Sequence, residues 1–150
     1  MGSSSSSPAP AFQGKTYATP IIIVPAVVTS LVSSLNVVDF LEMGNYVTNE
    51  KKKSDGTKRV PVQLVKRKLP SGQVLEYKIV DTIVGFEDKD WDRVVAVFAT
   101  GQDWQFKGWK WDTPVALFAK VFSNFYFYYC IVVMNQFTVA AACSILMALK

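Results

Sequence analysis

Hydrophobic positions between residues 20 and 99 follow patterns that are typical of strands. Residues 21–24 and 94–99 are continuous apolar runs, as in central strands that are covered on both faces. Residues 62–69 and 74–81 flank a Pro-Ser-Gly turn, and the second segment alternates strictly between apolar and polar positions. These two segments predict a β-hairpin. Its first arm is rich in lysine and arginine and therefore belongs at an exposed edge.

Capping residues predict helices between and after these strands. Asn36 is a favourable N-cap before an apolar face, and Gly44 is placed to end that helix. Residues 87–93 are polar and predict a short helix that holds Trp91 against the core.

A further helix begins at residues 112–114, where a capping residue precedes a proline at the first helical position. Val115, Phe118 and Phe122 fall on one face of this helix. The order strand, helix, hairpin, short helix, strand and helix predicts a mixed α/β sheet with helices packed on it.

Residues 50–59, EKKKSDGTKR, are predicted to form a charged loop that contains an Asp-Gly turn signal. Its cations are candidates for contact with phosphates or with an acidic protein surface. A solvated loop is the favoured interpretation, because like charges repel one another and stay hydrated. The candidate basic loop consists of Lys51, Lys52, Lys53, Lys58 and Arg59.

The composition excludes several kinds of chemistry. The chain of 150 residues has room for one core, and a net charge of +4 is mild for a dedicated nucleic-acid binder. Histidine is absent, which excludes Ser-His-Asp and Cys-His catalysis and histidine metal sites. Cys130 and Cys143 lie in an apolar segment without nearby cations, where a thiolate is not favoured. We therefore expect no catalytic residue, no metal site and no cofactor.

A strand followed by a loop and a helix is a place where a phosphate-binding loop could lie. The loop at residues 25–30 has no glycine that would admit a phosphate and no lysine that would reach one. Nucleotide hydrolysis is therefore not expected at this position.

The two ends of the chain differ from its body. Residues 1–19 are rich in Ser, Pro and Ala, which predicts a flexible leader without the pattern of a signal peptide. Residues 121–149 carry no charge and are long enough to span a bilayer, although Asn135 and Gln136 near the middle are costly in lipid. The soluble alternative is a buried strand and helix, because the first part is aromatic and β-branched and the second is helix-prone.

All four tryptophans lie in residues 90–111, which end in a tract of aromatic and basic side chains. Such a tract can stack bases while lysines meet phosphates, but two lysines are few for that purpose. Packing over the sheet with an exposed rim is favoured, and the rim is a candidate protein-contact patch. Arg93 is expected to pair with Asp90 or another nearby acid. The candidate patch consists of Arg93, Trp104, Phe106, Lys107, Trp109, Lys110 and Trp111.

The sequence DWDRVVAVF at residues 90–98, followed by WQFKGW at 104–109, closely resembles the C-terminal domain of the parafibromin family. Members of this family are subunits of the RNA polymerase II-associated factor complex. The resemblance covers about residues 20–120, and beyond Val121 the uncharged segment departs from it. Further segments that agree in order are residues 20–25, 29–31, 36–41, 50–53, 77–81 and 114–120.

The resemblance implies a Ras-like α/β fold, related to that of the P-loop GTPases but without nucleotide binding, which serves in the nucleus as an interaction module. The implied partners are other subunits of the complex, RNA polymerase II and chromatin or chromatin-modifying factors, in support of histone modification on transcribed genes. Direct binding to nucleic acid is a weaker expectation.

The predicted organisation is a leader at residues 1–19, a truncated Ras-like domain at 20–120 and a divergent hydrophobic tail at 121–150. Two alternatives stay open. One is a tail-anchored membrane protein that uses residues 121–149 as its anchor. The other is a degenerate GTPase-like nucleotide binder.

Overall fold

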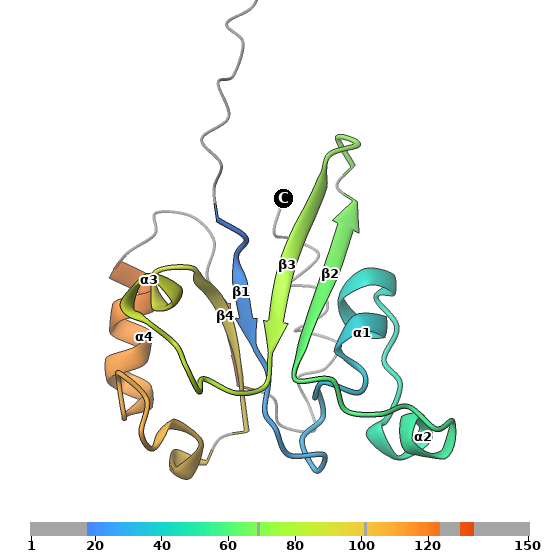
Figure 1. Ribbon diagram of the computed structural model, residues 1–150, viewed down its shortest axis with the longest axis horizontal. Helices are drawn as coiled ribbons and strands as arrows, with labels where there is room; N and C mark the ends of the chain where they lie inside the picture. Colours follow the sequence, from blue (N-terminus) through green and yellow to red (C-terminus); the bar gives the residue numbers. More distant parts are fainter. Residues whose placement is uncertain (1–17, 69, 101, 124–129, 134–150) are drawn as a thin grey trace, which may run out of the picture.

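The computed structural model describes residues 18–68, 70–100, 102–123 and 130–133, and within them five strands form one mixed sheet (Figure 1). The strands are β1 (Ile21–Ile23), β2 (Val62–Lys68), β3 (Val74–Val80), β4 (Val94–Ala99) and β5 (Cys130–Val133). Their order in the sheet is β2-β3-β1-β4-β5. β1 is parallel to β3 and β4, β4 is parallel to β5, and β2 is antiparallel to β3. The predicted hairpin and the mixed α/β class are confirmed.

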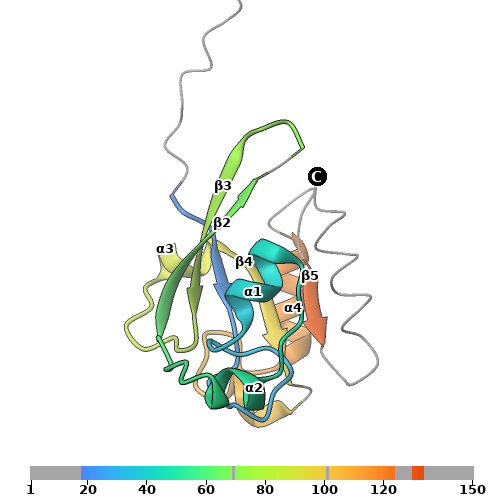
Figure 2. The same cartoon turned by 90° about the vertical axis from the view of Figure 1, so that its right-hand side faces the viewer.

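Helices lie on both sides of this sheet (Figures 1 and 2). Those nearest the β2 edge are α1 (Val37–Met43) and α2 (Asn49–Ser54). The other side holds α3 (Asp88–Trp91), the 3₁₀ helix η1 (Asp103–Phe106) and α4 (Pro114–Ser123).

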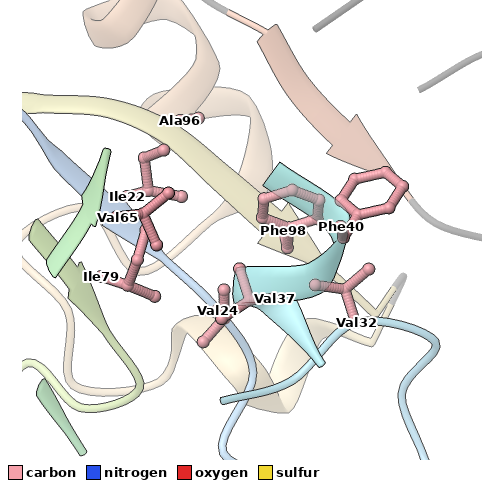
Figure 3. Close-up of a cluster of buried hydrophobic side chains, with 9 residues drawn as sticks. All are labelled: Ile22, Val24, Val32, Val37, Phe40, Val65, Ile79, Ala96 and Phe98. Carbon is pink, nitrogen blue, oxygen red and sulfur yellow. The ribbon is translucent and has the colours of Figure 1, made fainter. Parts of the chain in front are cut away.

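One hydrophobic core lies between α1 and the sheet (Figure 3). Ile22 of β1 and Phe98 of β4 point to this face, and Val37 and Phe40 of α1 cover them. The rings of Phe40 and Phe98 meet edge to face with their centroids 6.2 Å apart. Because side chains alternate along a strand, the neighbours of Ile22 point to the opposite face.

The second core occupies that opposite face. Ile21 and Ile23 of β1 pack there with Trp91 of α3, Phe106 of η1 and Leu117 of α4. These helices therefore bury the face that α1 does not cover, as a sheet with two apolar faces requires.

Of the three residues on the predicted apolar face of α4, the structure tests Val115 alone, because the side chains of Phe118 and Phe122 lie outside its described part. Val115 is 77% exposed, whereas Leu117 is fully buried in the second core. The predicted start of this helix is confirmed, because the Thr113 carbonyl and hydroxyl accept the N–H groups of Leu117 and Ala116. The helix is rotated so that the Leu117 position, rather than Val115, faces the sheet.

The ends of α1 are confirmed, but the predicted role of Asn36 is wrong. Gly44 ends the helix in the left-handed conformation, with φ of 64°. Asn36 precedes the first helical residue, yet its side chain makes no capping hydrogen bond. Its amide is turned into the preceding loop instead, where it binds main-chain groups.

The prediction of a loop at residues 50–59 is wrong for its first half, which forms α2. The Thr48 hydroxyl accepts the N–H of Lys51 and so caps the helix. Lys51 pairs with Asp55 one turn later, and Lys52 pairs with Asp39 of α1. These pairs offset the repulsion that favoured a solvated loop. The turn at Asp55 and Gly56 follows as predicted.

The hydrophobic segment after residue 120 contributes β5, which pairs in parallel with β4 from Ala96 to Ala99. This confirms the strand of the strand-and-helix interpretation, while the helix expected after it lies outside the described residues. Among the residues that the structure places, no helix is both long and apolar enough to cross a bilayer. The predicted leader lies outside the described residues up to residue 17.

Candidate interaction surfaces

The loop between β1 and α1 occupies the position where a phosphate-binding loop was considered. Its main chain is held by the buried side chain of Asn36. The Asn36 Nδ2 donates to the carbonyl oxygens of Leu31 and Val47, both at 2.8 Å. The Asn36 Oδ1 accepts the N–H of Ser33 at 2.9 Å. One amide therefore ties the loop to the segment that follows α1.

A second buried amide, that of Asn49 at the start of α2, holds the same loop from the other side. Its Nδ2 donates to the carbonyl oxygens of Val28 and Ser30, at 3.0 and 2.6 Å. Its Oδ1 accepts the hydroxyl of Ser33 at 2.8 Å. The chain's own side chains thus satisfy loop groups that point inward, whereas a phosphate loop turns a set of N–H groups towards an anion.

Ser33 and Asn49 were not among the residues predicted from the sequence. The signal that could have indicated them is a group of polar but uncharged residues in a loop. Ser33, Ser34 and Asn36 lie together at the end of the loop that follows a buried strand, and buried polar groups of this kind need partners. The partner Asn49 is remote in sequence, and only the folded chain brings it into contact with the loop.

A cleft of about 350 Å³ opens between this loop and the chain that follows β4. It lies beyond the carboxyl ends of β1 and β4, where strand order reverses and where ligands of α/β sheets commonly bind. None of the described residues that line it is charged, so this part of the chain supplies no cation there that would neutralise a phosphate. Apolar side chains on its wall include Pro25, Val27, Leu31, Val32, Phe98 and Trp104.

Aromatic side chains from three segments meet on the α3 side of the sheet. The Trp91 ring lies 5.6 Å from Trp109 and 5.4 Å from Trp111, measured between ring centroids. Phe86 touches Trp91 from another side at 5.3 Å, and Phe106 lies 5.2 Å from Trp109. This aromatic cluster packs the segment after β4 onto α3, as expected for tryptophans that anchor an irregular segment.

The residues of the predicted contact patch have different surroundings. Trp104 is 57% exposed and lines the cleft, and Lys107 is also exposed. Trp109 and Trp111 are half-buried in the aromatic cluster. Phe106 is fully buried, so it supports this surface and does not reach a partner.

Two cations of the predicted patch already have acidic partners within the chain. Lys110 pairs with Asp88 and lies 5.3 Å above the ring of Trp111. Arg93 pairs with Asp90 as predicted, and it also donates to the carbonyl of Thr19. The hydrogen bond from the Glu87 N–H, with help from Arg93, lowers the pKa of Asp90 below its ordinary value. Arg93 therefore joins β4 and α3 to the start of β1.

The candidate basic loop is largely paired as well. Besides the pairs of Lys51 and Lys52, Arg59 binds the buried carboxylate of Asp81 through two nitrogens, at 2.6 and 3.0 Å. Lys53 and Lys58 are exposed and have no ion pair within the described part of the chain. Much of the predicted cationic surface thus holds α2 and the following turn in place.

Comparison with known proteins agrees with this architecture. The chain matches the family model described as "RNA pol II accessory factor, Cdc73 family, C-terminal" over residues 16–141. The match continues past residue 120, where the resemblance recognised in the sequence ended, and it includes β5.

Individual proteins give the same result. The chain is 36% identical over 120 residues to cell division cycle protein 73 of Caenorhabditis elegans, and 37% identical over 110 residues to the CDC73 homolog of Arabidopsis thaliana. These alignments cover 79% and 71% of this chain but only 23% and 26% of the relatives, so the chain spans about a quarter of their length.

A solved structure, the conserved domain of yeast Cdc73, superimposes with a TM-score of 0.58 at 31% sequence identity. The overlap covers 67% of this chain and 63% of the other. Together with the strand order, it confirms the predicted Ras-like α/β fold and the resemblance to the parafibromin, or Cdc73, family. The chain therefore belongs to the Cdc73 family of RNA polymerase II accessory factors and carries that family's C-terminal domain at residues 16–141.

Proposed function

We propose that this chain acts as a non-catalytic protein-interaction domain of the polymerase-associated factor complex in the nucleus. In this role it supports the association of the complex with RNA polymerase II and with chromatin, and thereby histone modification during elongation. Membership of a family named as polymerase accessory factors is the observation that carries the proposal.

The β1–α1 loop supports this role over that of a GTPase-like nucleotide binder. Asn36 and Asn49 occupy the inward-facing groups of the loop, and the adjacent cleft has no charged residue among the lining residues that the structure describes. A nucleotide would bring several negative charges to this uncharged site. The match of the family model through residue 141 likewise favours the accessory domain over a tail-anchored membrane protein.

The contact surface that we propose is the exposed part of the aromatic tract. Trp104 offers a large ring beside the cleft, Lys107 adds a cation, and the half-buried Trp109 and Trp111 form the adjoining surface. Exposed tryptophan beside a cation is a combination that interfaces use for affinity. Phe106 fixes the position of this surface from beneath.

The test is retention of named partners by the immobilised full chain. Trp104→Ala with Lys107→Ala is expected to reduce recovery of complex subunits and RNA polymerase II, detected by immunoblot, by about tenfold. Because both side chains are exposed, the thermal unfolding midpoint should change little.

A matched control carries Met43→Ala with Lys53→Ala, which removes an exposed apolar side chain and an exposed lysine near α1 and α2. It is expected to bind normally. Loss of binding with this control and not with the Trp104 variant would show that the patch is assigned to the wrong surface.

A separate calorimetric titration with GTP and magnesium addresses the nucleotide alternative. No binding heat is expected at micromolar nucleotide. Micromolar affinity would contradict our interpretation of the β1–α1 loop.

A further inference from the structure

β2 forms one edge of the sheet, and no other strand among the described residues binds the main-chain groups on its outer side. In the antiparallel pairing with β3, the N–H of Asp81 binds the carbonyl of Pro61. Main-chain bonding to β3 alternates along such a pair, so residues 62, 64, 66 and 68 direct their N–H and C=O groups outward. β2 is seven residues long, which is sufficient to template another strand.

One outward group is already occupied by a side chain of α1. The Glu42 Oε1 accepts the N–H of Lys66 at 2.9 Å. For the outward N–H groups of Val62 and Leu64, the described residues provide no hydrogen-bond partner. Glu42 therefore blocks the middle of the edge and leaves the positions before it accessible.

The side chains at the same four positions share one face of the sheet. Val65, between them, points into the core under α1, so its neighbours point to the opposite face. α3 and α4 cover that face over β1 and β4, whereas among the described elements no helix lies over it at β2 (Figure 1). Val62 is 50% exposed and Leu64 is 58% exposed. Lys66 and Lys68 are exposed cations, and the Lys66 Nζ lies 3.8 Å from a carboxylate oxygen of Glu76 on β3, in an exposed pair that leaves Lys66 open to a further acidic group.

The exposed face of β2 thus has two apolar positions followed by two basic ones. Its charge argues against those pairings with a second copy of this chain that set Lys66 and Lys68 beside the same residues of another β2, because like charges opposite one another repel. An extended segment with acidic residues opposite the lysines and apolar residues opposite Val62 and Leu64 would instead complement each position.

We propose that β2 is a docking edge for an extended acidic segment of a partner protein, which adds to the sheet as a further strand. Main-chain hydrogen bonds supply the pairing, and alternate side chains of the segment supply specificity. In an antiparallel arrangement the complementary pattern is acidic, any, acidic, any, apolar, any, apolar. Glu42 competes with the segment for the N–H of Lys66. This edge is distinct from the aromatic contact surface.

The experiment uses the full chain and a fluorescein-labelled peptide with the core Glu-Thr-Glu-Thr-Val-Thr-Val, alongside the reversed sequence for parallel pairing. Fluorescence anisotropy measures affinity, and amide hydrogen exchange followed by NMR locates the peptide. Binding is expected to slow the exchange of the Val62 and Leu64 amides. No binding of either peptide, or protection confined to other strands, would overturn the proposal.

Charge variants separate strand addition from nonspecific attraction. Lys66→Glu with Lys68→Glu should weaken binding on the order of tenfold, because two attractions become repulsions. Lys51→Glu with Lys53→Glu makes the same charge change on α2 and should weaken peptide binding less than twofold at physiological salt. Equal losses in the two variants would show that only net charge matters and would overturn the proposal.

Glu42 gives the sharper test. Glu42→Ala frees the Lys66 N–H and should strengthen binding roughly two- to tenfold. Glu42→Gln removes the same charge but keeps an acceptor oxygen, so it should strengthen binding less than the alanine variant. Equal gains would attribute the effect to charge and contradict competition for the N–H.

Leu64→Pro tests the main-chain contact directly. Proline is tolerated at an edge where its N–H would face solvent, and it should abolish peptide binding while far-ultraviolet circular dichroism stays unchanged. Retained binding by a folded Leu64→Pro variant would refute strand addition. Sedimentation velocity without peptide is expected to show a monomer, and a dimer that Leu64→Pro dissociates would identify a second copy as the occupant and overturn the proposal.

Discussion

Asn49→Ala is expected to destabilise the domain more than its small change in volume suggests. The Asn49 side chain is buried and makes three hydrogen bonds to the β1–α1 loop. Alanine removes all three and leaves the carbonyl oxygens of Val28 and Ser30 without their donor. At roughly 0.5–1.5 kcal/mol for each hydrogen bond, the loss of unfolding free energy should be about 3 kcal/mol.

Equilibrium urea unfolding of the full chain, followed by tryptophan fluorescence, measures this loss. A decrease of about 3 kcal/mol is a large share of the roughly 5–15 kcal/mol that stabilises a typical domain. Asn45→Ala is the matched control, because Asn45 is exposed and lies only four positions before Asn49. It should change the unfolding free energy by less than about 0.5 kcal/mol.

The two variants also differ in what they should do to the loop. Without Asn49, residues 28–30 lose the contacts that hold them against α2, so limited proteolysis should cut this loop faster than in the Asn45→Ala control. Thr29 and Ser30 of this loop also line the cleft, so the cleft wall should become less ordered in the Asn49→Ala variant. A difference below about 1 kcal/mol between the two variants would refute the conclusion that the Asn49 amide holds the loop.

Two further predictions concern the other side of the sheet. Phe106→Ala should lower the unfolding free energy by about 3–5 kcal/mol, because it removes a fully buried ring that packs on Trp109. Urea unfolding will measure the loss, and near-ultraviolet circular dichroism will report the packing of the aromatic rings. A loss below about 1 kcal/mol would contradict this prediction. The lowered pKa of Asp90 means that its carboxylate stabilises the fold above the unfolded pKa, about 3.9, and that this stabilisation disappears as pH falls through the lower folded pKa. Asp90→Asn removes this carboxylate, so the unfolding free energy should fall less between about pH 5 and about pH 2 than it does in the unchanged chain. Urea titrations at several pH values measure this dependence, and an equal dependence on pH in both proteins would refute this role.

The sequence predicted those parts of the fold that depend on local pattern. The continuous run at residues 94–99 became a central strand, because every residue there packs within a sheet whose two faces are covered. The start of α4 was predictable from Thr113 and Pro114, since capping and proline geometry are local properties.

Predictions failed where distant residues decide the outcome. The lysines of residues 51–53 indicated a loop, because the sequence alone does not show that Asp39 lies beside Lys52 in the fold. Asn36 has the identity of an N-cap, but its amide is used by carbonyls at Leu31 and Val47, and the latter lies beyond the helix. For the candidate contact patch, aromatic content indicated the segment but not which rings are buried. The packing of Phe106 and Trp109 with Trp91, fifteen or more residues earlier, separates them from the exposed Trp104.

The way the β1–α1 loop is held has a consequence for how this domain can recognise partners. A ligand shifts a conformational equilibrium only as far as it binds one state better than another. Asn36 and Asn49 already hydrogen-bond the buried main-chain groups of this loop. A phosphate would therefore add few hydrogen bonds, and the loop does not need one to become ordered. The cleft wall and Trp104 are therefore held by contacts within the chain. We expect recognition by a preformed surface, which costs less ordering entropy on binding than a surface that a ligand must first assemble.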